Sequence, residues 1–266
     1  MKVSLFQVKV TDDEPYEQRL DRVLSAVAAE KGQDLIVLPE LWAHGGFSYD
    51  GWGQGEALDG PILTAVSEAA RKAGSYVHAG GIVEKNPSGR PFNTAVIFGP
   101  DGNRIAVYRK IHLYGFNEGE AVLFEPGKEI VTTKLAGVCS GIATCFDVRF
   151  PELFRSMVSE GAKLFVIPAA WPVARIPHWR HLLRARAIEN QAFVLGCATS
   201  GAHAGKTMGG YSAIIDPTGE IIAEASPGRD EVIRAELDIA QVDQVRSDFP
   251  VLDWRRLGLQ TPHPKQ

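Results

Sequence analysis

Short apolar runs constrain the fold of this chain more than any other feature of its sequence. The segment DLIVLPE at 34–40 contains a continuous apolar run that Pro39 closes. Such a run without polar alternation is typical of a strand covered on both faces, as in a sheet buried under helices. Further strands are expected at 164–169 and 192–199, where the sequence reads LFVIPA and AFVLGCAT. The chain is therefore expected to bury a sheet between other layers.

Helical and strand patterns are intermingled along the rest of the chain. Helices are predicted over 15–30, 62–72, 151–160 and 178–190, and further strands over 3–10, 76–83, 94–98, 104–109, 130–135, 140–144, 211–216, 221–225 and 232–237. Strands outnumber helices in 76–109 and 191–237, which favours mixed sheets with hairpins over a simple parallel sheet. Residues 110–127 are predicted to form a long loop. No linker, charge block or repeat divides the sequence, so we predict one α/β domain over 1–266.

Composition and charge exclude several classes of function. The 266 residues include 28 Lys and Arg against 32 Asp and Glu, so the basic excess of a nucleic-acid binder is missing. No apolar run approaches the roughly 18 residues that span a bilayer, and the N-terminal segment lacks a signal-peptide core. The three cysteines form neither a CxxC pair nor an even set, which is typical of reduced thiols. We expect a cytoplasmic protein that binds neither nucleic acid nor membrane.

The sequence predicts no cofactor site. Glycine pairs at 45–46, 80–81 and 209–210 form no GxGxxG or Walker motif. His178 and His181 have a spacing that can chelate a metal from one helix face, but no HExxH motif or converging Cys and Asp set accompanies them. We expect these two histidines on an ordinary helix surface or interface, and no metal or nucleotide in the protein.

Three reactive side chains stand where predicted strands end. These are Glu40, Lys110 and Cys145. Reactive groups gather at the carboxyl ends of strands in open α/β folds, so the three are candidates for one shared site. A cysteine attacks as the thiolate, and a carboxylate in a partly dry pocket beside a lysine can take its proton. Lys110 and the backbone N–H of Phe146 could stabilise the oxyanion formed on an amide carbonyl.

Each of these residues also has an ordinary structural interpretation. A single cysteine at a strand end is most often a small buried hydrophobe. Glu40 could cap the following turn, and Lys110 could be a surface charge in an Arg-Lys pair. Residue type and spacing alone leave both interpretations open, so the flanking sequence has to decide.

Three sequence blocks resemble the signature segments of the nitrilase superfamily of carbon–nitrogen hydrolases. They are LIVLPELW around Glu40, YRKIHLYG around Lys110 and CFDVRFPELFR from Cys145, in the order that the family shows. The similarity continues through PAAWPVARIPHW, RARAIENQAFVLGC and GGYSAIIDPTGEIIAEA, so it covers nearly the whole chain. The WPxxR and HWxxLLxARAIENQ phrasing is most similar to the ω-amidase and 2-oxoglutaramate amidase-like branch.

The resemblance implies both a fold and a mechanism. The fold is a four-layer αββα sandwich of two mixed β-sheets flanked by helices, assembled at least as a homodimer. The activity is that of a cofactor-independent thiol amidase, with Cys145 as nucleophile, Glu40 as general base and Lys110 stabilising the tetrahedral intermediate. A second glutamate after the lysine orients lysine and substrate in the family. Glu118 and Glu120 are both available for this role, and counting back from FEPG favours Glu120.

The branch implies small amides as substrates, such as ω-amides of 2-oxo dicarboxylic acids or short aliphatic amides. Arg175 could hold a substrate carboxylate while Trp171 walls the pocket, but an ion pair with a structural carboxylate is an equally weighted alternative. Aromatic side chains from nearby loops are expected either to line the same pocket or to anchor their loops by packing. These are Phe47, Tyr49 and Phe116.

Polar residues beside the nucleophile are expected to support its turn. Asp147, Arg149 and Glu152 in CFDVRFPEL are predicted to hold this turn through ion pairs and hydrogen bonds, without touching substrate. His112 is predicted to be a packed or hydrogen-bonded histidine, although it lies two residues after Lys110.

Several other functions stay as alternatives. Within the superfamily these are an N-carbamoyl amine hydrolase, a deaminated glutathione amidase and a nitrilase. A catalytically silent binding protein on the same fold would normally have lost one of the three reactive residues, and all three are present. A metal hydrolase that uses the histidines would lose activity with a chelator, whereas a thiol enzyme would be inactivated by alkylation.

Overall fold

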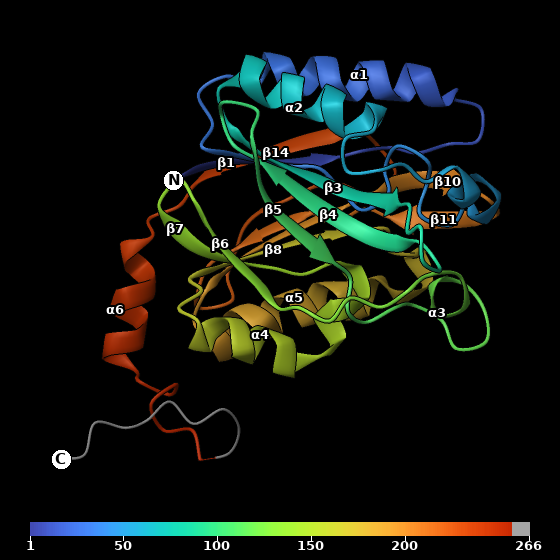
Figure 1. The fold of residues 1–266 in the computed structure, drawn as a ribbon. Helices are drawn as coiled ribbons and strands as arrows, with labels where there is room; N and C mark the ends of the chain where they lie inside the picture. Colours follow the sequence, from blue (N-terminus) through green and yellow to red (C-terminus); the bar gives the residue numbers. More distant parts are fainter. Residues whose placement is uncertain (257–266) are drawn as a thin grey trace.

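Two six-stranded β-sheets lie face to face and carry helices on their outer faces (Figure 1). The structure is a computed structural model and describes residues 1–256. The first sheet has the order β14 (Glu231–Glu236), β1 (Lys2–Gln7), β2 (Leu35–Val37), β3 (Tyr76–Glu84), β4 (Phe92–Phe98) and β5 (Arg104–Arg109). The second has the order β13 (Ile221–Glu224), β12 (Ala213–Ile215), β9 (Phe193–Ala198), β8 (Leu164–Ala169), β7 (Val138–Ile142) and β6 (Val131–Leu135).

Both sheets are mixed and share one pattern. Three neighbouring strands are parallel in each, β1, β2 and β3 in the first and β7, β8 and β9 in the second, and the flanking strands pair antiparallel. Helices α1 (Tyr16–Ala29) and α2 (Pro61–Ala73) cover the first sheet, and α4 (Pro151–Ser159) and α5 (Ile176–Asn190) cover the second (Figure 1). This is the predicted four-layer sandwich, and the prediction is confirmed.

Strand β2 shows why the apolar run at 35–38 determines this arrangement. Leu35 and Val37 pack into the core between the two sheets, whereas Ile36 and Leu38 pack into the core beneath α1 and α2. Alternate side chains of a strand point to opposite faces, so both faces of β2 need apolar residues. All four side chains are fully buried, and the predicted strand covered on both faces is confirmed.

Prolines at helix starts and a glycine at a helix end suit the backbone geometry of those positions. Pro61 and Pro151 occupy the first helical positions of α2 and α4, where the missing N–H has no intrahelical acceptor to lose. Helix α2 ends at Gly74, whose φ of 72° places it in the left-handed region that glycine adopts without strain. None of the helices in residues 1–256 is long and apolar enough to cross a membrane.

Several elements differ from the sequence prediction. The first strand ends at Gln7 and not near residue 10, and the helix predicted from 178 begins at Ile176. The predicted loop at 110–127 contains a one-turn helix, α3 (Glu120–Leu123). A hairpin of β10 (Ser200–His203) and β11 (Lys206–Gly209), and helix α6 (Ala240–Asp248), were not predicted.

Candidate active site

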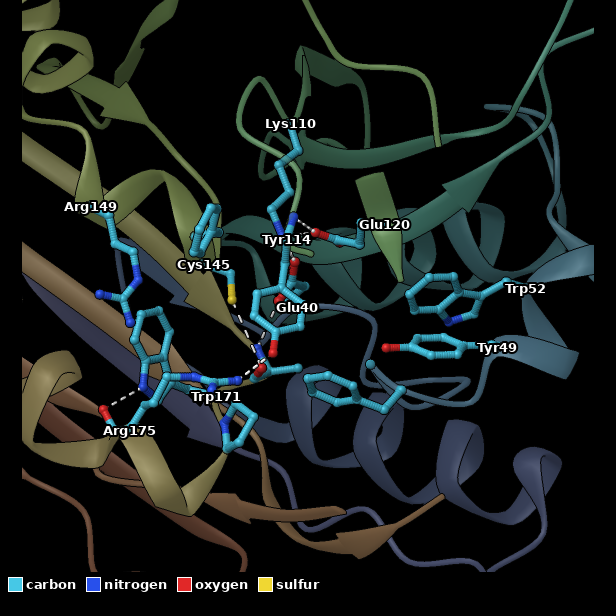
Figure 2. A pocket seen from close by; sticks show the side chains of 15 residues that line it. Glu40, Tyr49, Trp52, Lys110, Tyr114, Glu120, Cys145, Arg149, Trp171 and Arg175 are labelled. Carbon is cyan, nitrogen blue, oxygen red and sulfur yellow. Dashed lines mark hydrogen bonds and ion pairs between the residues drawn. The ribbon is translucent and has the colours of Figure 1, made fainter. Parts of the chain in front are cut away.

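The three reactive residues predicted at strand ends meet in one crevice, together with the predicted second glutamate (Figure 2). Glu40 follows β2, Lys110 follows β5, and Cys145 follows β7. Glu120 is the first residue of α3, in the connection after Lys110. All four side chains are at least nine-tenths buried. Both sheets therefore contribute to a site that forms where their strands end.

The ammonium of Lys110 lies between the two glutamates. Its Nζ donates to Oε1 of Glu40 at 2.7 Å and to Oε2 of Glu120 at 2.6 Å. Removing a charge from water is costly unless the charge is paired and hydrogen-bonded, and here the two carboxylates share one ammonium. The cation is thereby held in one position beside the sulfur of Cys145.

Asn93, at the start of β4, links the same two carboxylates from another direction. Its Nδ2 donates to Oε1 of Glu40 at 2.8 Å and to Oε1 of Glu120 at 2.6 Å. Backbone N–H groups supply the remaining donors: Ala170 to Oε2 of Glu40 and Tyr114 to Oε2 of Glu120, both at 2.8 Å. All four carboxylate oxygens therefore accept at least one hydrogen bond, which fixes the orientation of both side chains.

Burial and charge shift the pKa values of this cluster in different directions. Burial lowers the pKa of Lys110, but Glu120 and Glu40 outweigh it and hold this pKa well above its ordinary value. Burial raises the pKa of Glu120 although Lys110 opposes the shift. Burial and then Glu40 raise the pKa of the Cys145 thiol well above 9.0, against the effect of Lys110. The resting site therefore holds an ammonium ion beside a protonated thiol.

Cys145 opens a short 3-10 helix (Cys145–Arg149) three residues after β7 ends, whereas the sequence predicted it as the last residue of that strand. Cys145 has a φ of 49°, which is uncommon for a residue with a side chain and marks a sharp turn. Asp147 holds this turn, because its Oδ2 accepts from the Thr144 N–H at 2.8 Å and from the Tyr108 hydroxyl at 2.6 Å. The supporting role predicted for Asp147 agrees with these contacts.

His112 completes the support of this turn. Its backbone N–H donates to Oδ1 of Asp147 at 3.0 Å, and its Nδ1 lies 2.8 Å from the same oxygen. The imidazole also stacks on Phe150, with ring centroids 3.7 Å apart. His112 is therefore a packed and hydrogen-bonded histidine, as predicted.

A cavity opens onto the Cys145 sulfur, and six aromatic side chains contribute to its walls. Phe47, Tyr49 and Trp52 form one part of its lining, and Tyr114, Phe146 and Trp171 another. Such a mostly apolar cleft with a few convergent polar groups is typical of a site for a small molecule. The sequence predicted Phe146 and Trp171 there and left Phe47 and Tyr49 open between the pocket and loop packing, but it did not single out Trp52 or Tyr114.

Arg175 lies in this cavity and not against a structural carboxylate. It donates a hydrogen bond to the Tyr114 hydroxyl, and its guanidinium carbon lies 5.2 Å from the centroid of the Tyr114 ring. Trp171 holds its backbone, since the indole N–H donates to the Arg175 carbonyl at 2.7 Å. Among residues 1–256, no ion pair with a carboxylate is formed by Arg175. Of the two alternatives for Arg175, the structure favours the pocket.

Arg149 was expected to stabilise the nucleophile's turn through an ion pair, and this expectation is wrong. Its side chain lines the cavity, with the guanidinium carbon 5.0 Å from the Trp171 ring centroid and 5.6 Å from that of Phe146. Its hydrogen-bond partner is Nδ1 of His178, at 3.3 Å. The side-chain hydrogen bonds that hold the turn come from Asp147.

Phe116 was expected in the pocket, and the structure does not place it there. Its side chain is 88% exposed and is not part of the cavity lining. The connection bends at Gly115 and Gly119, where φ is 114° and 68°, so neighbouring residues of this loop face different directions. A loop without a regular period gives no signal in the sequence for such a turn.

The sequence analysis missed two further site residues, Tyr114 and Asn93, and only the first of them had a signal in the sequence. Tyr114 lies inside the YRKIHLYG block, so its proximity to Lys110 was a usable signal. Asn93 had none, because its partner Glu40 is 53 residues away. No group of three or more His, Cys, Asp or Glu side chains in the described part of the chain is arranged to hold a metal ion.

Comparisons with known proteins define the class of this site. The model of the carbon–nitrogen hydrolase family matches residues 2–247. A 2-oxoglutaramate amidase from Paenarthrobacter nicotinovorans is 43% identical, over 97% of this chain and 90% of that protein. A 2-oxoglutaramate amidase from Bacillus subtilis is 37% identical, over 97% of this chain and 98% of that protein. The chain belongs to the carbon–nitrogen hydrolase family, and the predicted membership of the nitrilase superfamily is confirmed.

A solved structure shows the same fold. It is a carbon–nitrogen hydrolase superfamily protein from Xanthomonas campestris with an arsenic adduct in its active site, and it matches with a TM-score of 0.89 at 28% identity. The match covers 98% of this chain and 99% of that one. The protein is accordingly a hydrolytic enzyme of the amidase type, which confirms the predicted enzyme class.

Proposed function

We propose that this enzyme hydrolyses the terminal amide of small amides that carry a carboxylate at their other end, such as ω-amides of 2-oxo dicarboxylic acids, and releases ammonia. The observation that carries the proposal is the set of groups that the cavity brings together. A buried thiol lies beside a carboxylate–ammonium–carboxylate cluster, and the same cavity contains the guanidinium of Arg175. The relatives named as 2-oxoglutaramate amidases support this choice of substrate.

In the first half of the reaction, Cys145 forms a thioester. Glu40 takes the thiol proton as the sulfur attacks the amide carbonyl, because burial raises the thiol pKa and disfavours a free thiolate. The oxyanion accepts hydrogen bonds from Lys110 and from the Phe146 N–H, which lies in the first turn of the 3-10 helix and has no acceptor within it. The carbon–nitrogen bond breaks when Glu40 returns the proton to nitrogen, and ammonia leaves.

In the second half, water replaces the amine. Glu40 removes a proton from water, the resulting hydroxide adds to the thioester carbonyl, and the carbon–sulfur bond breaks as Glu40 returns that proton to the leaving sulfur. The products are the carboxylic acid and the regenerated thiol. Glu120 holds Lys110 in place through both halves, because its Oε2 accepts from Nζ at 2.6 Å. No step needs a redox partner.

The remote carboxylate of the substrate would bind to Arg175. A guanidinium presents two parallel N–H donors to a carboxylate, and this pairing is directional as well as strong. The aromatic walls exclude water around it, which strengthens the attraction. Trp171 keeps Arg175 at the cavity through its bond to the backbone carbonyl.

The test compares wild type with Cys145→Ala on 2-oxoglutaramate, succinamate and butyramide, with ammonia as the readout. Wild type is expected to release ammonia and the variant to lose at least about a thousandfold in rate, because the thioester cannot form. Intact-mass spectrometry of rapidly quenched wild type should show an acyl adduct on Cys145. Equal release by both proteins, or an adduct on Cys139 or Cys197, would refute the assignment.

We also propose that the enzyme works as a homodimer in the cytoplasm. Phe249 and Trp254 are more than half exposed and contact each other edge to face, and exposed apolar groups of this size are typical of interfaces. The three cysteines are unpaired, which fits a reducing compartment. Light scattering should give twice the mass of one chain.

A further inference from the structure

Ala170, the residue after β8, contacts both reacting side chains through its backbone. Its N–H donates to Oε2 of Glu40 at 2.8 Å, and its carbonyl oxygen accepts from the Cys145 thiol, whose Sγ lies 3.8 Å away (Figure 2). In the proposed reaction the thiol proton moves to the Glu40 carboxylate. One residue therefore contacts both the donor and the acceptor of this proton.

These two contacts suit the resting state of the site. A carbonyl oxygen carries partial negative charge, so beside Sγ it favours the neutral thiol over the thiolate. The N–H of the same residue fixes the rotation of the carboxylate that later takes the proton. Because both groups belong to one residue, a shift of Ala170 would disturb the thiol and the base together.

Gly46 packs directly on Ala170 at the cavity wall. It lies in the loop that follows Glu40, and its φ is outside the left-handed region, unlike that of Gly45 at 91°. Its backbone would therefore accept other residues. The space would not, because a Cβ at position 46 would overlap the Cβ of Ala170. A Cβ is fixed to its own backbone, so Ala170 could give way only by moving its peptide groups.

The loop that carries Gly46 is held from its other side. Nη1 of Arg19, in α1, donates to the Ala43 carbonyl at 2.9 Å. The imidazole of His203, in the β10–β11 hairpin, packs on Gly45, where a Cβ would lie 2.8 Å from its Cδ2. Close packing of this kind leaves the loop little room to withdraw from Ala170.

Ala170 is equally fixed along its own chain. The carbonyl of Ala169 accepts from the Thr199 N–H at 3.0 Å, and the carbonyl of Trp171 accepts from the Gly209 N–H at 2.8 Å. The residues on both sides of Ala170 are thus hydrogen-bonded to other segments. Neither side of the contact with the loop is free to shift, so this contact determines where the Ala170 peptide groups lie.

We propose that Ala170 is catalytic through its backbone and that Gly46 is its positioning residue, an inference that rests on the proposed function. The chain leaves the general base at Glu40, turns through the loop and returns at Gly46 to the residue that orients this base. A side chain at position 46 would push Ala170 away from Glu40 and Cys145 at once. The proton transfer would then lose its alignment although every reacting side chain is still present.

The kinetic test is a size exchange between the two positions, measured on 2-oxoglutaramate. Gly46→Ala should lose about 30- to 100-fold in kcat with KM within about threefold of wild type, because the reacting groups are displaced and the substrate's own contacts are kept. Ala170→Gly should lose at most about fivefold. The double variant should return to the kcat of Ala170→Gly, since the overlapping Cβ is gone. No recovery, or a rise in KM alone, would overturn the inference.

A matched control separates this effect from crowding in general. Gly196, in β9, is also a buried glycine, and a Cβ there would overlap the Leu183 side chain, outside the cavity. Gly196→Ala should lose stability, as overpacked cores do, but keep the kcat of wild type. A loss of kcat as large as that of Gly46→Ala would overturn the inference.

Replacing Ala170 by its α-hydroxy analogue tests the contact with the base without any clash. The N–H becomes an ester oxygen, and no side chain changes. The kcat should fall about 10- to 100-fold, as expected for the loss of a hydrogen bond to a charged group. An unchanged kcat would overturn the inference, and this variant keeps it testable if Gly46→Ala does not fold.

Alkylation of Cys145 by iodoacetamide gives a readout that needs no amide substrate. The thiol attacks as its proton moves to Glu40, so Gly46→Ala should react about tenfold more slowly at pH 7, and the double variant at the rate of Ala170→Gly. Cys139, outside the cavity, should react alike in all variants and is the reference. Equal rates at Cys145 in wild type and Gly46→Ala would overturn the inference. Slower alkylation of Gly46→Ala, combined with no amide hydrolysis by wild type, would refute the proposed function alone.

Discussion

The two ends of the cavity differ in how completely their polar groups are satisfied. At the inner end, Lys110 and Asn93 bridge Glu40 and Glu120, and every carboxylate oxygen has a donor. At the outer end, the two guanidinium groups of Arg149 and Arg175 share one cavity without a carboxylate. The inner end is organised before substrate arrives, as catalysis by fixed charges requires. The outer end keeps N–H donors that no carboxylate of the described residues uses, so they are available to a ligand.

Asn93→Leu should break the organisation of the inner end, and it has the largest expected effect. Leucine has a similar volume and keeps water out, but both carboxylates lose a donor and face each other across an apolar side chain. We expect kcat to fall about 100-fold with KM nearly unchanged, because only the reacting end is disturbed. Stability should fall by about 3 kcal/mol, measured by urea unfolding.

Asn103→Leu is the control for this variant. Asn103 also donates to a carboxylate, Oδ2 of Asp101 at 2.7 Å, but in an exposed turn. Its kcat should match that of wild type. If Asn93→Leu kept kcat within about threefold of wild type, the bridge would have no role in holding Glu40 and Glu120.

The contrast between the two ends also explains which site residues the sequence could predict. Glu40, Lys110 and Cys145 follow strands and lie in distinctive segments, so both their chemistry and their positions are visible in the chain. Their convergence is now shown, while their catalytic roles stay predictions. Asn93 reaches Glu40 and Glu120, and Arg149 reaches the cavity, only because the fold brings distant segments together, and a side chain's neighbours across the sandwich cannot be inferred from residue type.

The same distinction holds for the fold. Strands with continuous apolar runs, such as β2, β8 and β9, were predicted because burial on both faces dictates their composition. Helix α6 has a single buried residue, Val242, and therefore lacks the apolar stripe that marks a helix in sequence. Helix α3 is one turn long and owes its existence to tertiary contacts of Glu120.

The Cys145 thiol gives a pH test of how dry the inner end is, with a smaller expected effect. Its pKa in the folded protein lies well above the unfolded value of 9.0, chiefly because of burial. Above pH 9 the unfolded chain therefore binds fewer protons than the folded one, and stability falls as pH rises. Wild type should lose about 1.4 kcal/mol per pH unit relative to Cys145→Ala in this range.

Unfolding by urea between pH 8 and pH 10.5, read by fluorescence, measures this difference. Cys139→Ala is the control, since Cys139 is more exposed and its removal should change the slope less. Below pH 9 the Cys145 thiol is protonated in both the folded and the unfolded chain. The difference in unfolding free energy between wild type and Cys145→Ala should therefore stay constant there. Parallel stability curves up to pH 10.5 would mean that the thiol is solvated in the folded enzyme.

Tyr114→Phe sharpens the description of the outer end and has the smallest expected effect. The variant removes the hydroxyl that accepts from Arg175 but keeps the ring beneath the guanidinium. The Arg175 N–H that loses the Tyr114 hydroxyl does not strengthen substrate binding. A carboxylate uses two of the five guanidinium donors, and two are already free in wild type. Loss of a fixed orientation should therefore dominate and raise KM for succinamate about 3- to 5-fold, with kcat unchanged.

Steady-state kinetics on succinamate and butyramide distinguish this effect from damage to the inner end. Tyr114 also donates its backbone N–H to Glu120, a bond that the substitution leaves intact. Butyramide kinetics should therefore equal those of wild type, as should both substrates with Tyr211→Phe, whose ring lies beneath Arg180 outside the cavity. A fall in kcat of about tenfold or more with Tyr114→Phe would show that the two ends of the cavity are coupled, because a hydroxyl that contacts only the recognition end would then control the chemistry.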